Sequence, residues 1–278
     1  MEASIDEIQN HYHRPNLYEI ITGQLEKQNI DLKQVGRRDL SAVDEFHVRG
    51  AAVSEELATS IDLEDQNVLD IGCGIGGPCR MLADQFNCQV TGIDLSPEYI
   101  RTANKLSELV RLDHKTTFIQ GNALDLPFQR HTFDAVWTQH VQMNVPDKKR
   151  FYAEIVRVLK PGGSFLYYEI LKKGKSTLDF PVPWSNRPEF SFLFKSSEMH
   201  SLLENLDMQK IKTTDQTIAG IEFFEKMLAR IHVQGPPLIG LNLLMGESTL
   251  LKISNLLKGL KEKALQLESG IYVKPDLN

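Results

Sequence analysis

The feature that most constrains the fold is a glycine-rich turn that directly follows a short apolar run. Residues 68–71 read Val-Leu-Asp-Ile, and Gly72, Gly74 and Gly76 come next within the segment VLDIGCGIGG. A short apolar run bounded by turn residues predicts a buried strand, and glycine lets the backbone turn sharply and approach a ligand closely. Pro78 suits the first position of a helix, where no amide hydrogen is needed. The segment therefore predicts a strand, a ligand-binding turn and a helix.

The same alternation of short apolar runs and helix-like segments continues along the chain. Four more strands of this kind are predicted at residues 89–95, 117–120, 133–138 and 164–170. Strands that alternate with helices are typical of a parallel sheet with crossover helices. Two further strands are predicted near residues 208–214 and 270–273. The pattern predicts the α/β fold class.

The segment that precedes this alternating region differs from it in composition. Residues 5–61 are polar and broken by proline and glycine, with apolar residues at helical spacing, namely Leu17, Ile20, Ile21 and Leu25. We predict that residues 1–60 form a helical N-terminal segment and that residues 61–278 form the main domain, with insertions near residues 172–196 and 218–262.

An acid at the end of the second predicted strand complements the glycine turn. Asp94 follows the turn by roughly 20 residues, the position from which a carboxylate accepts hydrogen bonds from ribose hydroxyls. Together the turn and Asp94 predict an adenosine site. Gly72, Gly74 and Gly77 also fit GxGxxG, so these residues alone leave an NAD-dependent oxidoreductase open as an alternative.

The residues around the turn resemble a known family. Asp70 lies two residues before the first glycine, and VLDIGCGIGG resembles motif I of the class I S-adenosylmethionine-dependent methyltransferases. The later motifs of that family have matches in the same order, in GIDLS, GNALDLPF with the following HTFD, and RVLKPGG. The resemblance implies a Rossmann-like, doubly wound, mostly parallel seven-stranded sheet with helices on both faces and an antiparallel last strand. It also implies S-adenosylmethionine as cofactor.

The resemblance assigns expected roles to the residues that match these motifs. The backbone of Gly72 and Gly74 would run alongside the methionine part of the cofactor. Asp94 would hold the ribose, and Leu95 would pack on the adenine. The expected cofactor-binding residues are Asp70, Gly72, Gly74, Asp94, Leu95, Asn122, Ala123 and Gln139. The family often has aspartate where this chain has Asn122, which can still accept a hydrogen bond through its carbonyl oxygen.

Three further segments indicate the kind of methyltransferase. VDEFHVRGAA, WTQHVQMN and FPVPWSNRPEFSFL resemble a bacterial small-molecule branch, similar to enzymes for quinones, sarcosine or dimethylglycine, and natural-product hydroxyls. The Asn-Pro-Pro-aromatic motif of enzymes that methylate DNA bases or glutamine is missing after the fourth predicted strand. The expected partner is therefore a small-molecule methyl acceptor, whose identity and methylated atom do not follow from the sequence.

The resemblance also implies that residues 1–60 cover the active site and that the insertions near residues 172–196 and 218–262 roof the substrate pocket. Candidate catalytic and substrate-binding residues come from the predicted carboxyl edge of the sheet and from this cover. His140 follows the fourth strand, and histidine has a titration range near neutrality, so it is the candidate general base, or a histidine that packs the loop or contacts the cofactor backbone. Glu169, near the end of the fifth strand, would orient a histidine, bind a substrate cation or cap a loop. His47, Tyr18 and Trp184 are candidate substrate contacts, with structural packing, and for the loop of Trp184 a homodimer contact, as alternatives. In-line methyl transfer requires no metal.

Composition limits the other function classes. The chain has 31 basic and 37 acidic residues and a formal net charge of −6, which argues against non-specific nucleic-acid binding. No window approaches the roughly 18 apolar residues of a membrane span, and no signal peptide is evident, so a cytoplasmic protein is expected. Cys73, Cys79 and Cys88 are expected as free, buried thiols. A catalytically silent, methyltransferase-like binding protein remains a second hypothesis.

Overall fold

The structure is a computed structural model of the chain. It describes residues 2–235, 237 and 240–276. Residue 1 and residues 277–278, at the outer ends of the two predicted domains, lie outside the described residues. So do residues 236 and 238–239, within the second predicted insertion.

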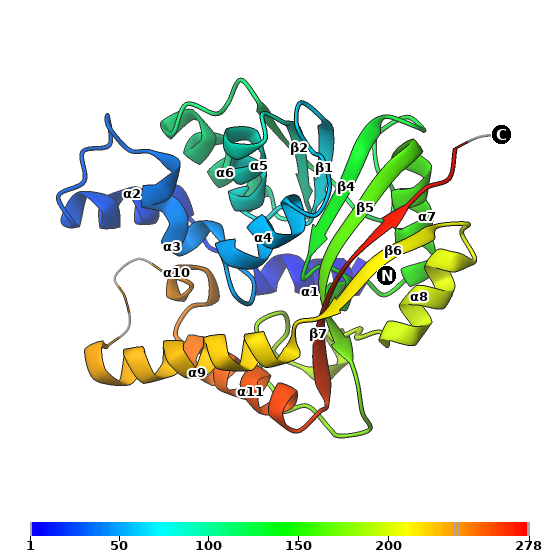
Figure 1. Ribbon diagram of the computed structural model, residues 1–278. Coiled ribbons are helices and arrows are strands. Elements are labelled where there is room, and N and C mark those ends of the chain that lie inside the picture. Colours follow the sequence, from blue (N-terminus) through cyan, green and yellow to red (C-terminus); the bar gives the residue numbers. More distant parts are fainter. Residues whose placement is uncertain (1, 236, 238–239, 277–278) are drawn as a thin grey trace.

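A seven-stranded sheet in the order β3-β2-β1-β4-β5-β7-β6 forms the centre of the fold (Figure 1). The strands are β1 (Asn67–Ile71), β2 (Gln89–Asp94), β3 (Thr116–Gln120), β4 (Phe133–Gln139), β5 (Leu159–Lys172), β6 (Gln209–Asp215) and β7 (Leu265–Val273). The first five strands pair in parallel, and β7 runs antiparallel between β5 and β6. The doubly wound fold class expected from the sequence is confirmed, including its antiparallel last strand.

The last strand is much longer than the four residues predicted for it. It pairs with β5 from Leu265, opposite Lys172, to Val273, opposite Ser164. The polar residues Glu268 and Ser269 in its middle hid the strand from a pattern-based prediction. Both are buried, and Glu268 accepts hydrogen bonds from Tyr167 Oη (2.8 Å) and Ser196 Oγ (2.7 Å). A carboxylate inside this strand is tolerated because residues distant in sequence satisfy it.

Helices cover both faces of the sheet. One face carries α4 (Ala51–Ala58), α5 (Gly77–Gln85) and α6 (Pro97–Leu109), and the other carries α7 (Lys148–Val158) and α8 (Ser196–Glu204). The local sequence sets their starts: Ser96 accepts a hydrogen bond from Tyr99 N (3.3 Å) ahead of Pro97 at the first turn of α6. Asp147 caps α7 in the same way, through Arg150 N (3.0 Å).

The N-terminal segment folds as short helices that pack onto the main domain. They are α1 (Glu2–His11), α2 (Leu17–Lys27), η1 (Arg37–Leu40) and α3 (Ser41–Asp44). Leu17, Ile21 and Leu25 of α2 are fully buried in a cluster with residues of α6. Asp44 forms a buried ion pair with Arg80 of α5, at 2.5 Å. A hydrophobic face and one buried ion pair therefore hold the cover against the sheet domain.

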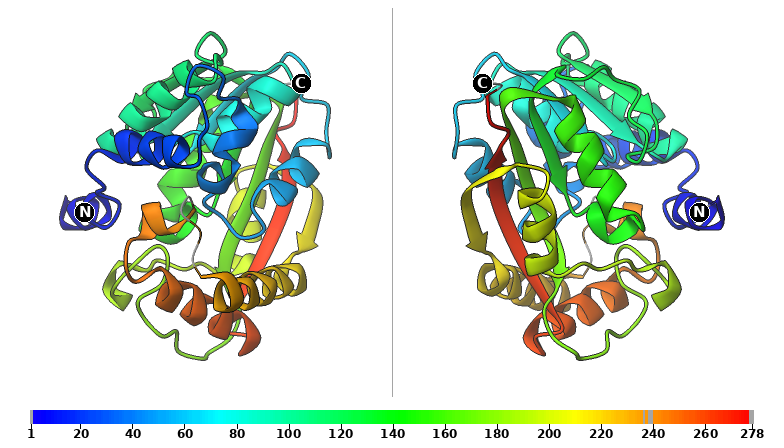
Figure 2. Two further views of the ribbon diagram at one scale, coloured as in Figure 1. Left: turned by 90° about the vertical axis from the view of Figure 1, so that its left-hand side faces the viewer. Right: turned by 90° about the vertical axis from the view of Figure 1, so that its right-hand side faces the viewer.

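The remaining helices lie at the carboxyl edge of the parallel strands. They are α9 (Thr217–Gln234), α10 (Asn242–Met245) and α11 (Thr249–Lys261), and Figure 1 shows α9 and α11 beside the lower end of β7. Figure 2 shows the C-terminal end of the chain at the opposite edge. Val182 and Trp184, from the loop after β5, share one buried cluster with residues of α9 and α11. Both predicted insertions thus lie over the edge where open α/β sheets bind ligands.

Candidate active site

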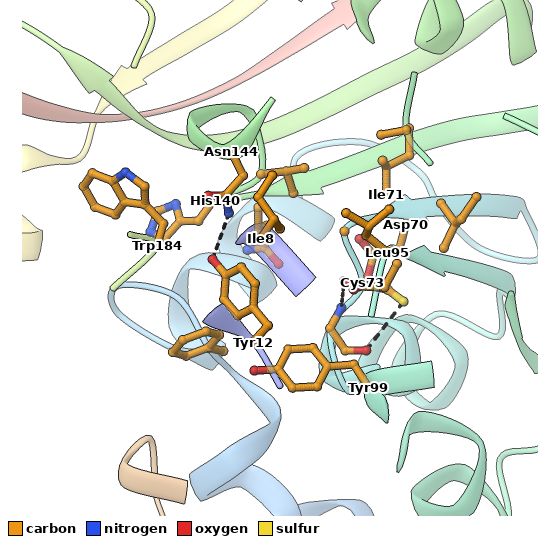
Figure 3. Close-up of a pocket in the computed structure, with 18 of the residues that line it drawn as sticks. Ile8, Tyr12, Asp70, Ile71, Cys73, Leu95, Tyr99, His140, Asn144 and Trp184 are labelled. Atoms are coloured by element: carbon orange, nitrogen blue, oxygen red, sulfur yellow. Dashed lines mark hydrogen bonds between the residues drawn. The ribbon is translucent and has the colours of Figure 1, made fainter. Parts of the chain in front are cut away.

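A cavity opens at the carboxyl edge of the sheet, between the glycine turn and the N-terminal cover (Figure 3). Eleven of the thirteen site residues singled out from the sequence line it: His47, Asp70, Gly72, Gly74, Asp94, Leu95, Asn122, Ala123, Gln139, His140 and Trp184. Asp94, Leu95 and Asn122 lie at one end, where β2 and β3 end. His140 and Trp184 lie toward the other end, across Tyr12 in Figure 3. The fold therefore brings together residues that are more than 130 positions apart.

Two glycines of the turn are required for different reasons. Gly72 has φ +73°, and a Cβ there would lie 2.5 Å from Cγ2 of Val141. Gly74 has φ +54°, and a Cβ there would meet no atom within 4 Å, because the residue faces the cavity. L-residues rarely adopt these φ values. The first glycine allows close packing and the second leaves backbone open to a ligand.

Asp94 is held in place by the backbone of both neighbouring turns. Its Oδ2 accepts a hydrogen bond from Gly74 N (3.0 Å) and its Oδ1 accepts one from Ser96 N (2.8 Å). Burial raises the pKa of the Asp94 carboxyl, while these amide hydrogen bonds oppose that rise. Each carboxylate oxygen keeps acceptor capacity for another donor. The group is thus oriented before any ligand binds and fits a pair of hydroxyl donors.

Asp70 lies behind the turn and is almost fully buried, with 2% of its surface exposed. Its Oδ2 accepts a hydrogen bond from the thiol of Cys79 at 3.1 Å. Burial, with smaller contributions from the charges of Asp94 and Glu45, raises the pKa of Asp70 to about 7. A carboxyl group with a raised pKa in the folded protein destabilises the fold at pH values where it must ionise.

This shift predicts a pH-dependent effect of Asp70→Asn on stability. The ionised form of Asp70 is disfavoured in the folded state but not in the unfolded state. Its destabilising effect therefore begins near the ordinary pKa of 3.8, grows as the pH rises, and is complete above pH 7. The gain in unfolding free energy of the ligand-free Asn variant over wild type should therefore be larger at pH 8 than at pH 5. We expect a difference of about 2 kcal/mol between the two pH values in urea titrations. A gain independent of pH would contradict this account of Asp70.

Gln139, at the end of β4, belongs to a polar network under the cover. The indole Nε1 of Trp137 donates to Gln139 Oε1 (2.9 Å), so Gln139 Nε2 points to Ser54 Oγ (3.1 Å). Ser54 Oγ in turn donates to Glu45 Oε2 (3.1 Å). Glu45 and Ser54 carry no motif of their own, although Glu45 lies in the VDEFH segment that also contains His47.

His47 lines the cavity and shares this network. Its Nε2 lies 3.0 Å from Ser54 Oγ and 3.2 Å from both Gln139 Nε2 and Glu45 Oε2. Burial lowers the pKa of His47 to about 4 and raises that of Glu45 to about 7. At neutral pH the histidine is therefore uncharged, and the network anchors the cover to β4.

His140 is fixed by hydrogen bonds at both ring nitrogens. Nδ1 donates to the carbonyl oxygen of Tyr168 at 3.1 Å, and Nε2 accepts from Val48 N at 3.2 Å. Burial lowers the pKa of His140 well below its usual value. A general base needs a free lone pair and a pKa near the working pH. The structure therefore favours the alternative role, a histidine that packs the loop, over the base expected from the sequence.

Tyr18 does not reach the cavity. It lies on α2, where its ring packs at the edge of the α2–α6 cluster and Lys105 Nζ lies 4.8 Å from the ring centroid. Tyr12 lines the cavity instead, and its Oη accepts a hydrogen bond from Asn144 Nδ2 at 2.8 Å. Sequence spacing could not show which of Tyr12 and Tyr18 lines the cavity, because the chain bends between α1 and α2.

Glu169 also lies outside the cavity lining. It is 1% exposed, and its Oε2 accepts hydrogen bonds from Val141 N (3.1 Å) and Gln142 N (3.3 Å). Burial raises its pKa to about 7. Of the three roles open from the sequence, the geometry fits the capping of a loop. That loop follows His140 and carries the cavity residues Met143 and Asn144.

A lysine that the sequence did not reveal joins this loop to the roof. Lys148 donates from Nζ to the carbonyl oxygens of Gln142 (2.5 Å) and Phe192 (2.6 Å). The side chain is buried, which lowers the pKa of Lys148 to about 7. Backbone carbonyl groups supply no sequence signal, so only the structure identifies this connection.

Trp184 lines the cavity from the loop after β5. It is 2% exposed and donates from Nε1 to Ser191 Oγ at 2.9 Å. A side chain this buried offers little surface to a second chain. The geometry thus favours a roof over a homodimer contact for this residue.

The fold and the cavity define a Rossmann-like α/β protein with a nucleotide-type site at the carboxyl edge of its sheet. Comparison with known families gives the narrower result: residues 69–167 match the model described as "Methyltransferase domain". This region holds the glycine turn, Asp94 and β4. Residues 69–167 are therefore similar to methyltransferase domains, which agrees with the resemblance of the sequence motifs to class I methyltransferases.

Individual relatives are similar over part of their length. A tocopherol O-methyltransferase of Arabidopsis thaliana is 38% identical over 144 residues, which are 50% of this chain and 40% of that protein. A norajmaline N-methyltransferase of Rauvolfia serpentina is 33% identical over 176 residues, 59% of each chain. The matched region thus spans less than two thirds of the length of each of these relatives.

A solved structure is similar over nearly the whole chain. It is a geranyl diphosphate C-methyltransferase from Streptomyces coelicolor, with 18% identity, a TM-score of 0.70 and coverage of 98% of both chains. At this identity the likeness concerns the fold, and it extends to the cover and the roof.

Proposed function

We propose that the protein transfers a methyl group from S-adenosylmethionine to an O, N or C atom of a small metabolite and releases S-adenosylhomocysteine. The observation that carries this proposal is one cavity that runs from the carboxylate of Asp94, past the open backbone of Gly74, to the roof at Trp184. A carboxylate that can accept from ribose hydroxyls at one end and a compartment lined by Tyr12 and Trp184 at the other suit a cofactor and an acceptor placed end to end. The methyltransferase domain at residues 69–167 supports the same proposal.

The residues of the cavity fit the cofactor. Asp94 would accept from the ribose hydroxyls, Leu95 would pack on the adenine, and Asn122 and Ala123 would border the adenine edge. Asp70, Gly72, Gly74 and Gln139 would surround the methionine part. When bound, the cofactor supplies an electrophilic methyl group on a sulfonium sulfur. Because Gly74 faces open space, the backbone leaves room for this group.

The protein's contribution to the reaction would be alignment and the exclusion of water. Tyr12, Trp184 and Leu244 line the proposed acceptor side of the cavity and would exclude water from it. The rate of an in-line displacement rises most when the enzyme holds the two reactants in line. His47 and Trp184 remain proposed substrate contacts, and Tyr12 replaces Tyr18 among them. His140 would position the end of β4 through its two hydrogen bonds.

This role of His140 predicts a small effect of His140→Gln. Glutamine can donate to the Tyr168 carbonyl oxygen and accept from Val48 N, so both hydrogen bonds have a replacement. We expect kcat to fall by less than about 10-fold, whereas loss of a general base costs about 100-fold or more. His114→Gln, at an exposed position, is the matched control. A loss of 100-fold or more in kcat with unchanged KM would restore His140 as the base.

The acceptor is proposed only as a small molecule. The named relatives methylate O, N and C atoms, so they do not select one. The acidic net charge of −6 supports an acceptor that is not a nucleic acid. In the part of the chain that the structure describes, no helix is long and apolar enough to cross a bilayer. A cytoplasmic location remains a proposal, supported by three buried free thiols.

Turnover tests the proposal. The purified protein should release S-adenosylhomocysteine from S-adenosylmethionine in the presence of at least one member of a panel of small amines, hydroxyls and acidic carbons. The Asp94→Ala variant should not. Cofactor binding without turnover against the whole panel would favour the catalytically silent binding protein instead.

A further inference from the structure

A buried lysine lies next to the acceptor side of the cavity, and the proposed chemistry does not use it. Lys252 belongs to the first turn of α11 and is 2% exposed. Its Nζ makes one hydrogen bond within the described residues, to the carbonyl oxygen of Met245 at 3.3 Å. A buried ammonium group without a counter-charge is costly, and the N-terminal end of a helix disfavours a cation further.

A second cation approaches the same corner of the chain. The guanidinium of Arg14 lies against Gly246, with Nη2 3.6 Å from where a Cβ on that glycine would be. Arg14 Nη1 donates to the His13 carbonyl oxygen at 2.7 Å, while its Nε is buried and has no partner among the described residues. Lys252 and Arg14 therefore converge on the adjacent residues Met245 and Gly246.

Among the side chains of residues 7–235, 237 and 240–276, no acid forms an ion pair with either cation. Glu7, the acid of α1 whose charge acts on His11, pairs with Arg187 at 3.0 Å. Burial and the charge of Arg14 lower the pKa of Lys252 to about 8. Within these side chains, the positive charge at this point is thus left without a paired acid.

Lys252 and Arg14 are not among the residues that line the cavity, but the residues around them adjoin its wall. Leu244, which lines the cavity, directly precedes Met245. On the other side, His11 donates from Nε2 to the carbonyl oxygen of Pro183 at 2.8 Å, and both Pro183 and Tyr12 line the cavity. Figure 1 shows α1, α10 and the start of α11 at the same edge of the sheet.

We propose that Lys252 and Arg14, with the N-terminal turn of α11, bind an anionic group, a phosphate or a carboxylate, carried by the methyl acceptor. Helix N-terminal amides and basic side chains are the common donors for such groups. An anion here would offset both charges and hold the acceptor at the end of the cavity opposite Asp94. This assignment rests on the proposed function, because it makes the anion part of the substrate.

Inorganic phosphate is the probe for the site. It should raise the Tm of the wild-type protein beyond the effect of sodium chloride at equal ionic strength, since a ligand that binds the folded state stabilises it. Lys252→Met and Arg14→Gln should each weaken phosphate binding at least 10-fold. Lys226→Met, at an exposed position of α9, should not. Without phosphate, Lys252→Met should raise the Tm, because it removes an uncompensated buried charge.

Three results would overturn the site. They are the absence of phosphate binding to wild type, equal losses in the Lys226 control, and a lower Tm of ligand-free Lys252→Met, which would make the lysine structural. Using two separate variants keeps the test valid if one of them fails to fold. Titration with S-adenosylhomocysteine in the same samples separates this inference from the proposed function. If wild type binds S-adenosylhomocysteine but not phosphate, only the anion site is lost.

The source of the anion is decided by kinetics. For an acceptor found in the panel, phosphate should compete with the acceptor and raise its KM. The anionic member of a matched acceptor pair, such as a phosphorylated and a free hydroxyl compound, should have a kcat/KM at least 10-fold higher. Lys252→Met should lose that preference while keeping its affinity for S-adenosylhomocysteine. Phosphate binding without effect on the KM of the acceptor would indicate a free anion and overturn the assignment to the substrate.

Discussion

Replacing Asp94 with alanine should weaken the binding of S-adenosylhomocysteine by about 100-fold or more. Hydrogen bonds to a charged group contribute about 1.5–3 kcal/mol each, and the ribose would donate two of them. A loss of about 3 kcal/mol corresponds to about 100-fold in Kd. The variant also removes the acceptor for Gly74 N, which lies 3.0 Å from the carboxylate, so the turn itself loses a contact.

Matched variants make this result specific to the position. Asp94→Asn keeps one carbonyl acceptor and should fall between wild type and the alanine variant. Asp113→Ala removes the charge of an exposed aspartate in the same domain and should leave the Kd unchanged. Near-normal affinity in Asp94→Ala would mean that other residues hold the ribose, and the cofactor site would have to be reassigned.

The second large effect is expected from Gly77→Ala, where the N-terminal cover touches the sheet domain. A Cβ at residue 77 would lie 1.7 Å from the backbone carbonyl oxygen of Asp44, a distance that no rotamer change can relieve. The backbones of α3 and α5 would have to separate, and the buried Asp44–Arg80 pair would be stretched. We expect a loss of about 3 kcal/mol in the free energy of unfolding, measured by urea titration.

Gly23→Ala is the control for this prediction. Gly23 lies inside α2, and a Cβ there would meet no atom within 4 Å. Alanine is favoured over glycine in a helix interior by about 1 kcal/mol, so this variant should be slightly more stable than wild type. Equal destabilisation by both substitutions, or none at Gly77, would contradict the close contact between cover and sheet.

The parts of the fold and site that the sequence predicted are those with local signals. The glycine turn, Asp94 and the strand–helix alternation each depend on residues within a few positions of one another, so pattern reading located them. The extra length of β7 escaped because Glu268 is satisfied by Tyr167 and Ser196, which lie far away in the sequence. A charged residue considered alone predicts an exposed position. Only the structure shows the distant partners that allow Glu268 to be buried in a strand.

The substrate side of the site was harder to predict for the same reason. Tyr12 lines the cavity and is held there by a hydrogen bond from Asn144, which is 132 residues away in the sequence. Tyr18, only six residues further along, packs between α2 and α6 instead. His140 looked like a base because its position is favourable. Both of its ring nitrogens prove to be engaged by backbone groups of Tyr168 and Val48. Such contacts carry no sequence signal.

The identity of the cofactor is tested most directly by calorimetric titration of the purified protein with S-adenosylhomocysteine and, separately, with NAD. We expect saturable binding of S-adenosylhomocysteine with a stoichiometry near one per chain and no binding of NAD. Binding of NAD without binding of S-adenosylhomocysteine would contradict this expectation.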